Sequence, residues 1–244
     1  MSQSDNDTTP PLRPILPGAR IAEAVYQTIR DAICDGILRP DERVVQDELA
    51  LRLSVSRQPV HQALRQLHKE GFLTETGRRG LVVAPLDPDF ARQVYELRAA
   101  LDGPAAAMAA ARARPGARAA GDRILRAGRA AVADGDLGAM ASADFAFHDF
   151  IYELGGNRLI AATARGNWHH VRRSIMLLAR APTKLGPFWD EHEQILQAIV
   201  SGDAAAADRL ARGHALSSMG VLAAMRRDGH GEAGSQSPRI SAGV

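Results

Sequence analysis

The sequence predicts a mainly α-helical protein, with an N-terminal winged helix-turn-helix followed by an all-helical bundle of about six helices. Alanine is abundant and aromatic residues make up only 5% of the chain, which favours helices with small packing residues over sheets. The early segments are short and mixed, whereas every later segment has the apolar spacing of a helix. The prolines of "APLDPDF" at 84–90 mark the linker between the two parts.

Composition narrows the class of protein. Apolar residues make up 45% and charged residues 24% of the 244 residues, an ordinary globular balance. The single cysteine, Cys34, excludes an intrachain disulfide and a cysteine-rich zinc site. The sequence has no secretory signal, and no apolar run approaches the roughly 18 residues that cross a bilayer. We therefore expect a soluble cytoplasmic protein with no membrane partner, a disordered leader at 1–18 and a disordered tail at 228–244.

The first domain is expected over residues 19–86. An apolar residue at every fourth position from Ile21 to Ile33 predicts an amphipathic helix over 19–35. The segment "ILRPDERVV" is typical of a short extended stretch with a turn, and "QDELALRL" of a short helix. These two segments separate the first helix from a longer third one.

The third helix is expected to begin after Ser56, a residue type that caps helix N-termini, and to end at Gly71. "FLTE" and "LVVA" flank "TGRRG" and predict two strands joined by a glycine-bounded turn. The order of helix, short helix, capped helix and hairpin is that of a winged helix-turn-helix.

The outer faces of the third helix carry side chains that suit double-stranded DNA. Arginine can form bidentate hydrogen bonds to guanine, and glutamine to adenine, in the major groove. Residues 56 to 69 include three basic residues and no acidic one. In the hairpin turn, Arg78 and Arg79 could reach phosphates or a minor groove. Any one of these arginines could simply be a solvent-exposed residue of an ordinary helix or turn. The occurrence of all these side chains together, on the third helix and in the hairpin turn, favours DNA binding.

The stretch "LALRLSVSRQPVHQALRQLHKEG" is similar to the DNA-binding domain of GntR-family transcription regulators, and the resemblance covers residues 19–86. Two departures are Asp41, where the family usually has glycine, and His61, which replaces an arginine. The operator sequence therefore does not carry over. The resemblance implies DNA contacts for Ser56, Arg57, Gln58, His61, Arg65 and Gly80, to which the turn adds Arg79.

The second domain is expected over residues 87–227, and its segments are bounded by glycine, proline or aspartate. The predicted helices span 88–112, 117–134, 137–155, 157–180, 184–201 and 203–227.

Four residues of the bundle could bind a metal. In "SADFAFHDF", Asp144 and His148 lie four positions apart and so share a helix face. His192 and His214 lie beside apolar positions of two later helices. One carboxylate and three imidazoles suit a divalent ion, zinc first with nickel or manganese as alternatives, and leave positions open for a ligand. The alternative is four unrelated residues, with His148 a core histidine, and spacing alone leaves the two even.

Arg98 has two interpretations. It flanks a predicted buried stripe of Val94, Leu97 and Leu101. It could form a surface ion pair with Asp102 four positions on, or point its guanidinium into a cavity as a fork for a ligand carboxylate. The residues alone favour the surface pair.

Three segments of the bundle, "ELRAALDGPAAAMAA", "DFAFHDFIYELGGNRLI" and "EHEQILQAIVSGDAAAADRLARGH", resemble the FCD effector domain of the FadR branch of this family, over roughly residues 88–227. The resemblance implies that Arg98 meets the carboxylate of an effector. The intact metal set implies a small, metal-coordinated carboxylate rather than an acyl ligand. By this resemblance the metal ligands are Asp144, His148, His192 and His214.

The expected function is that of a homodimeric, ligand-responsive transcription regulator without enzymatic activity. It is expected to repress transcription by binding operator DNA, and a small carboxylate is expected to relieve this repression. One alternative is a metal-dependent hydrolase that uses the three-His, one-Asp site, although no general base is identifiable beside it. Another is an architectural DNA-binding protein without an effector.

Overall fold

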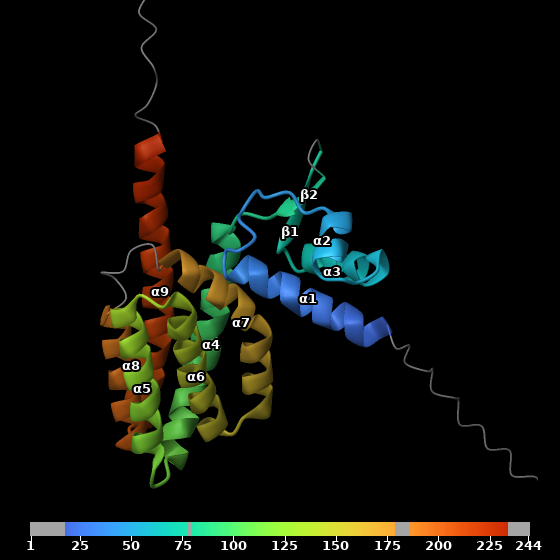
Figure 1. The fold of residues 1–244 in the computed structure, drawn as a ribbon. Coiled ribbons are helices and arrows are strands. Elements are labelled where there is room, and N and C mark those ends of the chain that lie inside the picture. Colours follow the sequence, from blue (N-terminus) through green and yellow to red (C-terminus); the bar gives the residue numbers. More distant parts are fainter. Residues whose placement is uncertain (1–17, 78–79, 179–185, 234–244) are drawn as a thin grey trace, which may run out of the picture. The chain divides into compact units, whose positions relative to one another are not determined.

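The computed structural model describes residues 18–77, 80–178 and 186–233 (Figure 1). The chain divides into two compact units, each built from two stretches of the sequence. The first contains residues up to Arg30 together with Glu42–Val83, and the second contains Asp31–Asp41 and the chain from Ala84 onward. The described part is mainly helical, as the sequence predicts, and none of its helices is long and apolar enough to span a membrane.

The first unit has the element order expected of a winged helix-turn-helix. Its elements are α1 (Gly18–Cys34), which continues into the second unit, α2 (Gln46–Arg52), α3 (Arg57–Lys69), β1 (Leu73–Thr76) and β2 (Gly80–Val83). The two strands are antiparallel, and their register runs from Leu73 opposite Val83 to Thr76 opposite Gly80. The expected extended stretch before α2 forms only an isolated bridge between Arg43 and Val82.

The turn at Asp41 requires an unusual backbone. Asp41 has a φ of 64°, in the left-handed region where glycine is favoured and aspartate is among the better tolerated residues. The departure from the family's glycine therefore keeps the turn, because aspartate can adopt the conformation that the turn needs.

The second unit is a bundle of helices. Its helices are α4 (Pro88–Arg112), α5 (Ala117–Asp134), α6 (Leu137–Gly155), α7 (Arg158–Leu178), α8 (Gly186–Val200) and α9 (Ala204–Ala233). The last helix continues past residue 227, so the expected disordered tail from 228 is wrong as far as Ala233. A helix that is already formed extends at little cost, because each further residue adds a hydrogen bond without a new nucleus.

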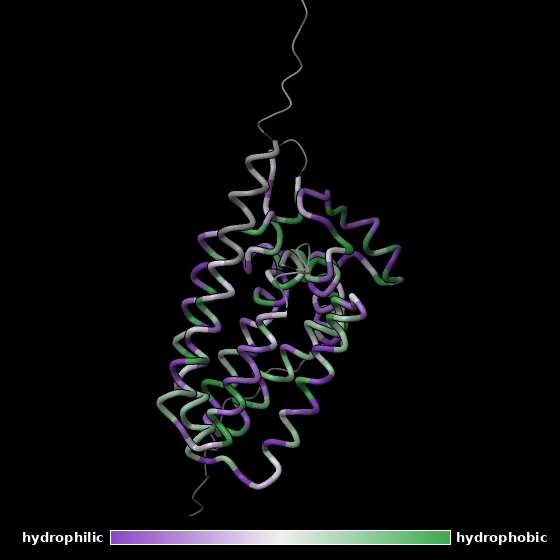
Figure 2. Tube along the Cα trace, turned by 90° about the vertical axis from the view of Figure 1, so that its left-hand side faces the viewer, coloured by the Kyte–Doolittle hydropathy of each residue, from purple (hydrophilic) through white to green (hydrophobic). Residues whose placement is uncertain are grey.

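Small residues bring the helices of this unit close together. In α4, four alanines are buried in the core, and α4 contacts α6, α7, α8 and α9. Hydrophobic and hydrophilic residues alternate along the helices of the bundle (Figure 2). Leu97 is 38% exposed, so its predicted place in the buried stripe is wrong. The buried face of α4 instead includes Tyr95, Arg98 and Asp102. The two charged residues can be buried because they form an ion pair with each other.

Candidate metal centre and ligand cavity

The predicted DNA-contacting residues that the structure describes in the first unit are all exposed. Ser56 is the N-cap of α3, with extended backbone and no side-chain capping bond. Arg57 pairs with the exposed Asp47 at 2.8 Å. Gly80 begins β2 with a φ of 71°, which favours glycine. Arg79 lies outside the described residues. Four side chains of α3 in the predicted set are exposed: Arg57, Gln58, His61 and Arg65.

The opposite face of α3 is buried. Val60 and Leu67 have no exposed surface, and Ala63 and Leu64 are also buried. This packing fixes the helix on its unit, so the exposed arginine and glutamine side chains project from a rigid element.

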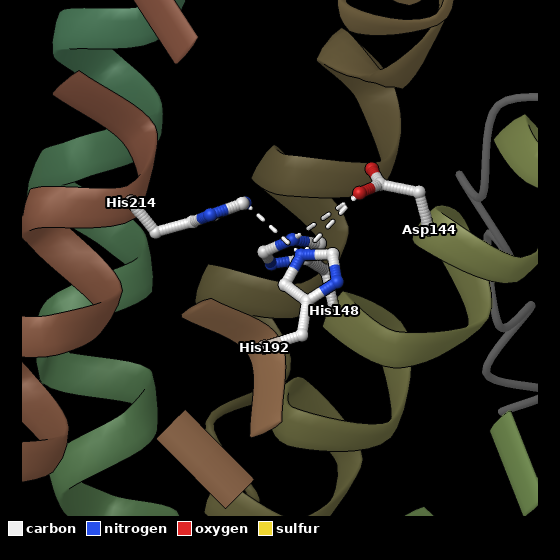
Figure 3. Close-up of side chains that lie close together, drawn as sticks. All are labelled: Asp144, His148, His192 and His214. Carbon is white, nitrogen blue, oxygen red and sulfur yellow. Dashed lines mark hydrogen bonds and ion pairs between the residues drawn. The ribbon is translucent and has the colours of Figure 1, made fainter. Parts of the chain in front are cut away.

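The four predicted metal ligands of the second unit come together (Figure 3). Asp144 and His148 lie on α6, His192 on α8 and His214 on α9. Each offers one ligand atom, and these four atoms lie within 4.8 Å of one another. The three imidazoles are buried, and the Asp144 side chain is 13% exposed. Residues from three helices, α6 and the consecutive α8 and α9, thus converge on one point.

The distances between the ligand atoms resemble those around a metal ion. His192 Nε2 lies 3.0 Å from His214 Nε2 and 3.4 Å from Asp144 Oδ1. His148 Nε2 lies 3.9 Å from the same carboxylate oxygen. Ligands at about 2.0–2.2 Å from a tetrahedral zinc ion are separated by roughly 3.4 Å. These three separations lie within about 0.5 Å of that value, and all four ligand atoms lie within 4.8 Å of one another.

Several buried atoms of this centre have no hydrogen-bond partner within the described part of the chain: His148 Nε2, Asp144 Oδ2 and His192 Nδ1. A buried polar atom without a partner is costly, by about 1–3 kcal/mol. A cation bound by His148 Nε2 and the Asp144 carboxylate would remove two of these deficits. The donor set and its unpaired atoms therefore fit a divalent metal.

Two of the imidazoles, those of His148 and His192, are held in the neutral form that binds metals. Burial lowers the pKa of His148 well below its usual value, and Arg98 and the two other imidazoles lower it further. Burial likewise lowers the pKa of His192, with further contributions from His214, Arg98 and Arg129. Neutral imidazoles offer a lone pair to a metal, whereas protonated ones do not.

Two further carboxylates contact the centre, and the sequence interpretation assigned neither to it. Glu191 of α8 lies with Oε2 2.7 Å from Nδ1 of His214. Asp102 of α4 lies with Oδ2 3.4 Å from Nδ1 of His148. Three acidic residues lie within two positions of His192, so the sequence gives no means of selecting Glu191 from them.

The expected surface pair of Arg98 with Asp102 is instead a buried pair. Arg98 Nε donates to Asp102 Oδ2 at 3.1 Å, and both side chains are at least 92% buried. Tyr152 also donates its hydroxyl to Asp102. The surface interpretation is wrong because α6 and α9 cover this face of α4. Burial raises the pKa of Asp102, although Arg98 and Tyr152 oppose that shift.

Arg98 lines two neighbouring cavities of the second unit. The first is bounded by the ligand side chains Asp144, His192 and His214, and its remaining walls include Met140 and Trp189. The second has His148 on its wall and is lined by apolar and aromatic residues of α4, α6 and α7. Arg98 Nη2 is 3.6 Å from Asp144 Oδ2. A carboxylate in the first cavity could therefore meet both the guanidinium and a metal.

Comparison with known proteins gives two family matches. Residues 21–83 match "Bacterial regulatory proteins, gntR family", and residues 93–217 match the FCD domain. The chain is 28% identical over 223 residues to the "Putative L-lactate dehydrogenase operon regulatory protein" of Escherichia coli strain K12, covering 80% of this chain and 83% of that protein. It is 33% identical over 130 residues to an uncharacterized HTH-type transcriptional regulator of Agrobacterium vitis, covering 52% and 75%.

Solved structures share the fold. E. coli McbR/YncC superposes with a TM-score of 0.70 at 19% identity, covering 84% of this chain and 98% of that one. A structure described as a GntR transcriptional regulator from Rhodococcus sp. RHA1 superposes with a TM-score of 0.69 at 22% identity, with the same coverage. Both likenesses extend over most of the chain.

Proposed function

Because the chain belongs to the GntR family of bacterial regulatory proteins and carries an FCD domain, we propose that it senses a small carboxylate at a metal centre in its second unit. The chain is a ligand-responsive, DNA-binding transcription regulator of the FadR-like type. One observation carries the proposal: Arg98 and three of four potential metal ligands line the same cavity.

The metal would be held by Asp144, His148, His192 and His214. Three nitrogens and one carboxylate suit zinc, with nickel or manganese as alternatives. When bound, the ion supplies two positive charges and open coordination positions for ligand oxygens. The relatives are named as regulators, which favours sensing over turnover.

Arg98 would bind the carboxylate of the effector. Its guanidinium lies between Asp102 at 3.1 Å and Asp144 at 3.6 Å, so without a metal one cation faces two carboxylates. An incoming carboxylate would meet a net negative site. A divalent ion beside Asp144 reverses that sign, because it adds two positive charges. Effector binding should therefore depend on the metal.

The effector should be small. Protein atoms line the first cavity from α4, α6, α7, α8 and α9, and its walls away from the ligands include Met140, Phe188 and Trp189. One relative carries the name of an L-lactate dehydrogenase operon, which points to a short hydroxy acid as the first class to test. A hydroxyl or keto oxygen beside the carboxylate would offer a second atom to the metal.

DNA binding would use α3 and the hairpin of the first unit, in a homodimer. Two copies of α3 would read a nearly palindromic operator, with half-sites about 34 Å or multiples apart. The effector must bind one geometry of the dimer better than another in order to change DNA affinity. We propose that it relieves repression.

A thermal-shift screen of short carboxylates tests the proposal. With zinc present, a carboxylate that binds at 100 times its Kd should stabilise the protein by about 2.7 kcal/mol, and it should give no shift after chelation. Arg98→Ala should abolish the shift. Arg118→Ala is the matched control, because Arg118 also pairs with an aspartate four positions on but lies outside the cavity. Equal shifts without metal, or in Arg98→Ala, would contradict the proposal.

A further inference from the structure

Glu191 joins α8 to α9 through the imidazole of His214. Its Oε2 lies 2.7 Å from Nδ1 of His214, and its Oε1 accepts a hydrogen bond from the Ser217 hydroxyl at 3.1 Å. The His214 side chain is 2% exposed and that of Glu191 is 32% exposed. The carboxylate is thus held by two donors of α9, at the edge of the centre rather than inside it.

This contact decides which nitrogen of His214 carries the proton. An ionised carboxylate only accepts hydrogen bonds, so Nδ1 of His214 must be the protonated, donating nitrogen. In the neutral ring Nε2 is then the acceptor, with its lone pair directed toward the other ligands. A metal could take this lone pair without any change of tautomer.

The same reasoning extends to His192. Its Nε2 lies 3.0 Å from Nε2 of His214, which carries no proton in the neutral ring described above. His192 must therefore donate from its own Nε2, which leaves its Nδ1 as the buried, unpaired nitrogen. When both rings are neutral, the tautomers of His214 and His192 in the metal-free protein thus follow from one carboxylate.

We infer that Glu191 is a positioning residue of the metal centre, which holds His214 with Nε2 ready to bind the ion. The inference rests on the proposed metal site. Carboxylates that hold the second nitrogen of a ligating histidine typically change metal affinity by 10–100-fold when removed. The neighbouring Glu193 cannot share the role, because it is two positions along α8 and its carboxylate bonds to Arg118.

The first test measures zinc affinity by competition with a chromophoric chelator. Glu191→Ala should weaken zinc binding by about 10–100-fold. Glu191→Gln should weaken it less, because the amide oxygen still accepts the Nδ1 hydrogen bond. Glu193→Ala is the control and should bind zinc as the unmodified protein does. The visible spectrum of bound cobalt should change in Glu191→Ala alone, which a loss of folding stability would not produce.

The second test reads the tautomer directly, by ¹⁵N NMR of the histidine side chains in the metal-free protein. The unmodified protein and Glu191→Gln should both show His214 protonated at Nδ1, whereas Glu191→Ala should lose this preference. Unchanged zinc affinity, cobalt spectrum and tautomer in Glu191→Ala would overturn the inference. Absence of zinc binding by the unmodified protein would instead contradict the proposed metal centre, and the NMR result alone would then decide whether Glu191 sets the tautomer.

Discussion

Burial keeps two histidines of the proposed metal centre neutral. His148 and His192 are at most 2% exposed, and burial is the main cause of their lowered pKa values. Both therefore stay neutral in the folded protein at a pH where the unfolded chain takes up protons. The cost of this arrangement is a sensitivity to acid, because protons bind preferentially to the unfolded state.

The pH dependence of stability follows with a definite sign. In the unfolded chain these histidines titrate near pH 6.5. Above that pH the two histidines do not change the free energy of unfolding. As the pH falls below it, the free energy of unfolding decreases by up to about 1.4 kcal/mol per pH unit for each histidine. Urea denaturation of the metal-free protein at several pH values measures the slope. The double variant His148→Gln, His192→Gln should show a shallower slope, and an equal slope would contradict the assignment.

Asp102 offers a second test at this scale, since it balances Arg98 in the interior. Replacing it with asparagine leaves the Arg98 charge with less compensation. We expect Asp102→Asn to destabilise the protein by about 3–5 kcal/mol, as for a broken buried pair. Asp122→Asn is the control, because Asp122 forms the same i,i+4 pair with Arg118 in a more exposed place. It should cost about 1 kcal/mol or less, measured by the same denaturation.

Single elements are positioned by small residues and caps. Gly128 of α5 has Trp189 of α8 packed directly on it, and a Cβ there would lie 1.8 Å from the indole. Trp189 in turn stacks edge-to-face with His192, with the ring centroids 4.9 Å apart. The packing of α5 against α8 therefore sets the position of His192, a proposed metal ligand. The Asn157 side-chain oxygen caps the start of α7, because it accepts from the backbone N–H groups of Leu159 and Ile160.

Gly128→Ala should therefore damage both packing and metal binding. Overpacking of this kind costs about 1–3 kcal/mol, and displacement of α8 should also weaken zinc binding. Gly166→Ala in α7 is the control, since a Cβ there meets nothing within 4 Å. It should be neutral or stabilising by up to about 1 kcal/mol, because alanine is the better helix former. Thermal denaturation and zinc titration of both variants measure the difference, and equal behaviour would argue against the packing role.

The whole molecule combines two units of different chemistry. The first carries an exposed, basic helix face, and the second buries four potential metal ligands. Each unit is compact in itself, and each buries apolar residues of its own, such as Val60 and Leu67 in the first and Phe147 and Ile195 in the second. A ligand-responsive regulator needs both, one to read DNA and one to bind the effector.

DNA binding tests the first unit in the full-length protein. Arg65→Ala should weaken operator binding by about 1–3 kcal/mol if its guanidinium reads a base. It should reduce the salt slope by about one if it contacts a phosphate. Arg123→Ala removes the same charge from an exposed position of α5 and serves as the control. Affinities measured on a selected operator at several salt concentrations distinguish these outcomes, and equal losses in both variants would refute a specific role for α3.

Much of the fold could be predicted because it depends on local patterns. Apolar spacing, caps and glycines set α4, α5 and α6 at the expected ends, and motif spacing singled out Asp144, His148, His192 and His214. Periodicity fixes the face of a helix, so ligands placed beside apolar positions were expected to point inward. The family resemblance then selected metal binding over four unrelated residues.

Tertiary structure alone decided which partners the buried charges have. No local pattern shows that Asp102 is covered by neighbouring helices and accepts from Arg98 and Tyr152, or that Glu191 rather than Glu193 reaches His214. No local pattern shows either that the indole of Trp189 packs directly on Gly128. The sequence by itself determined the helices and singled out the exposed face of α3 and the four candidate ligands, because these follow from spacing and motifs along one chain. Contacts between helices depend on how the bundle packs. Packing sets the distances between side chains of different helices, their burial and the partners of their charged groups together.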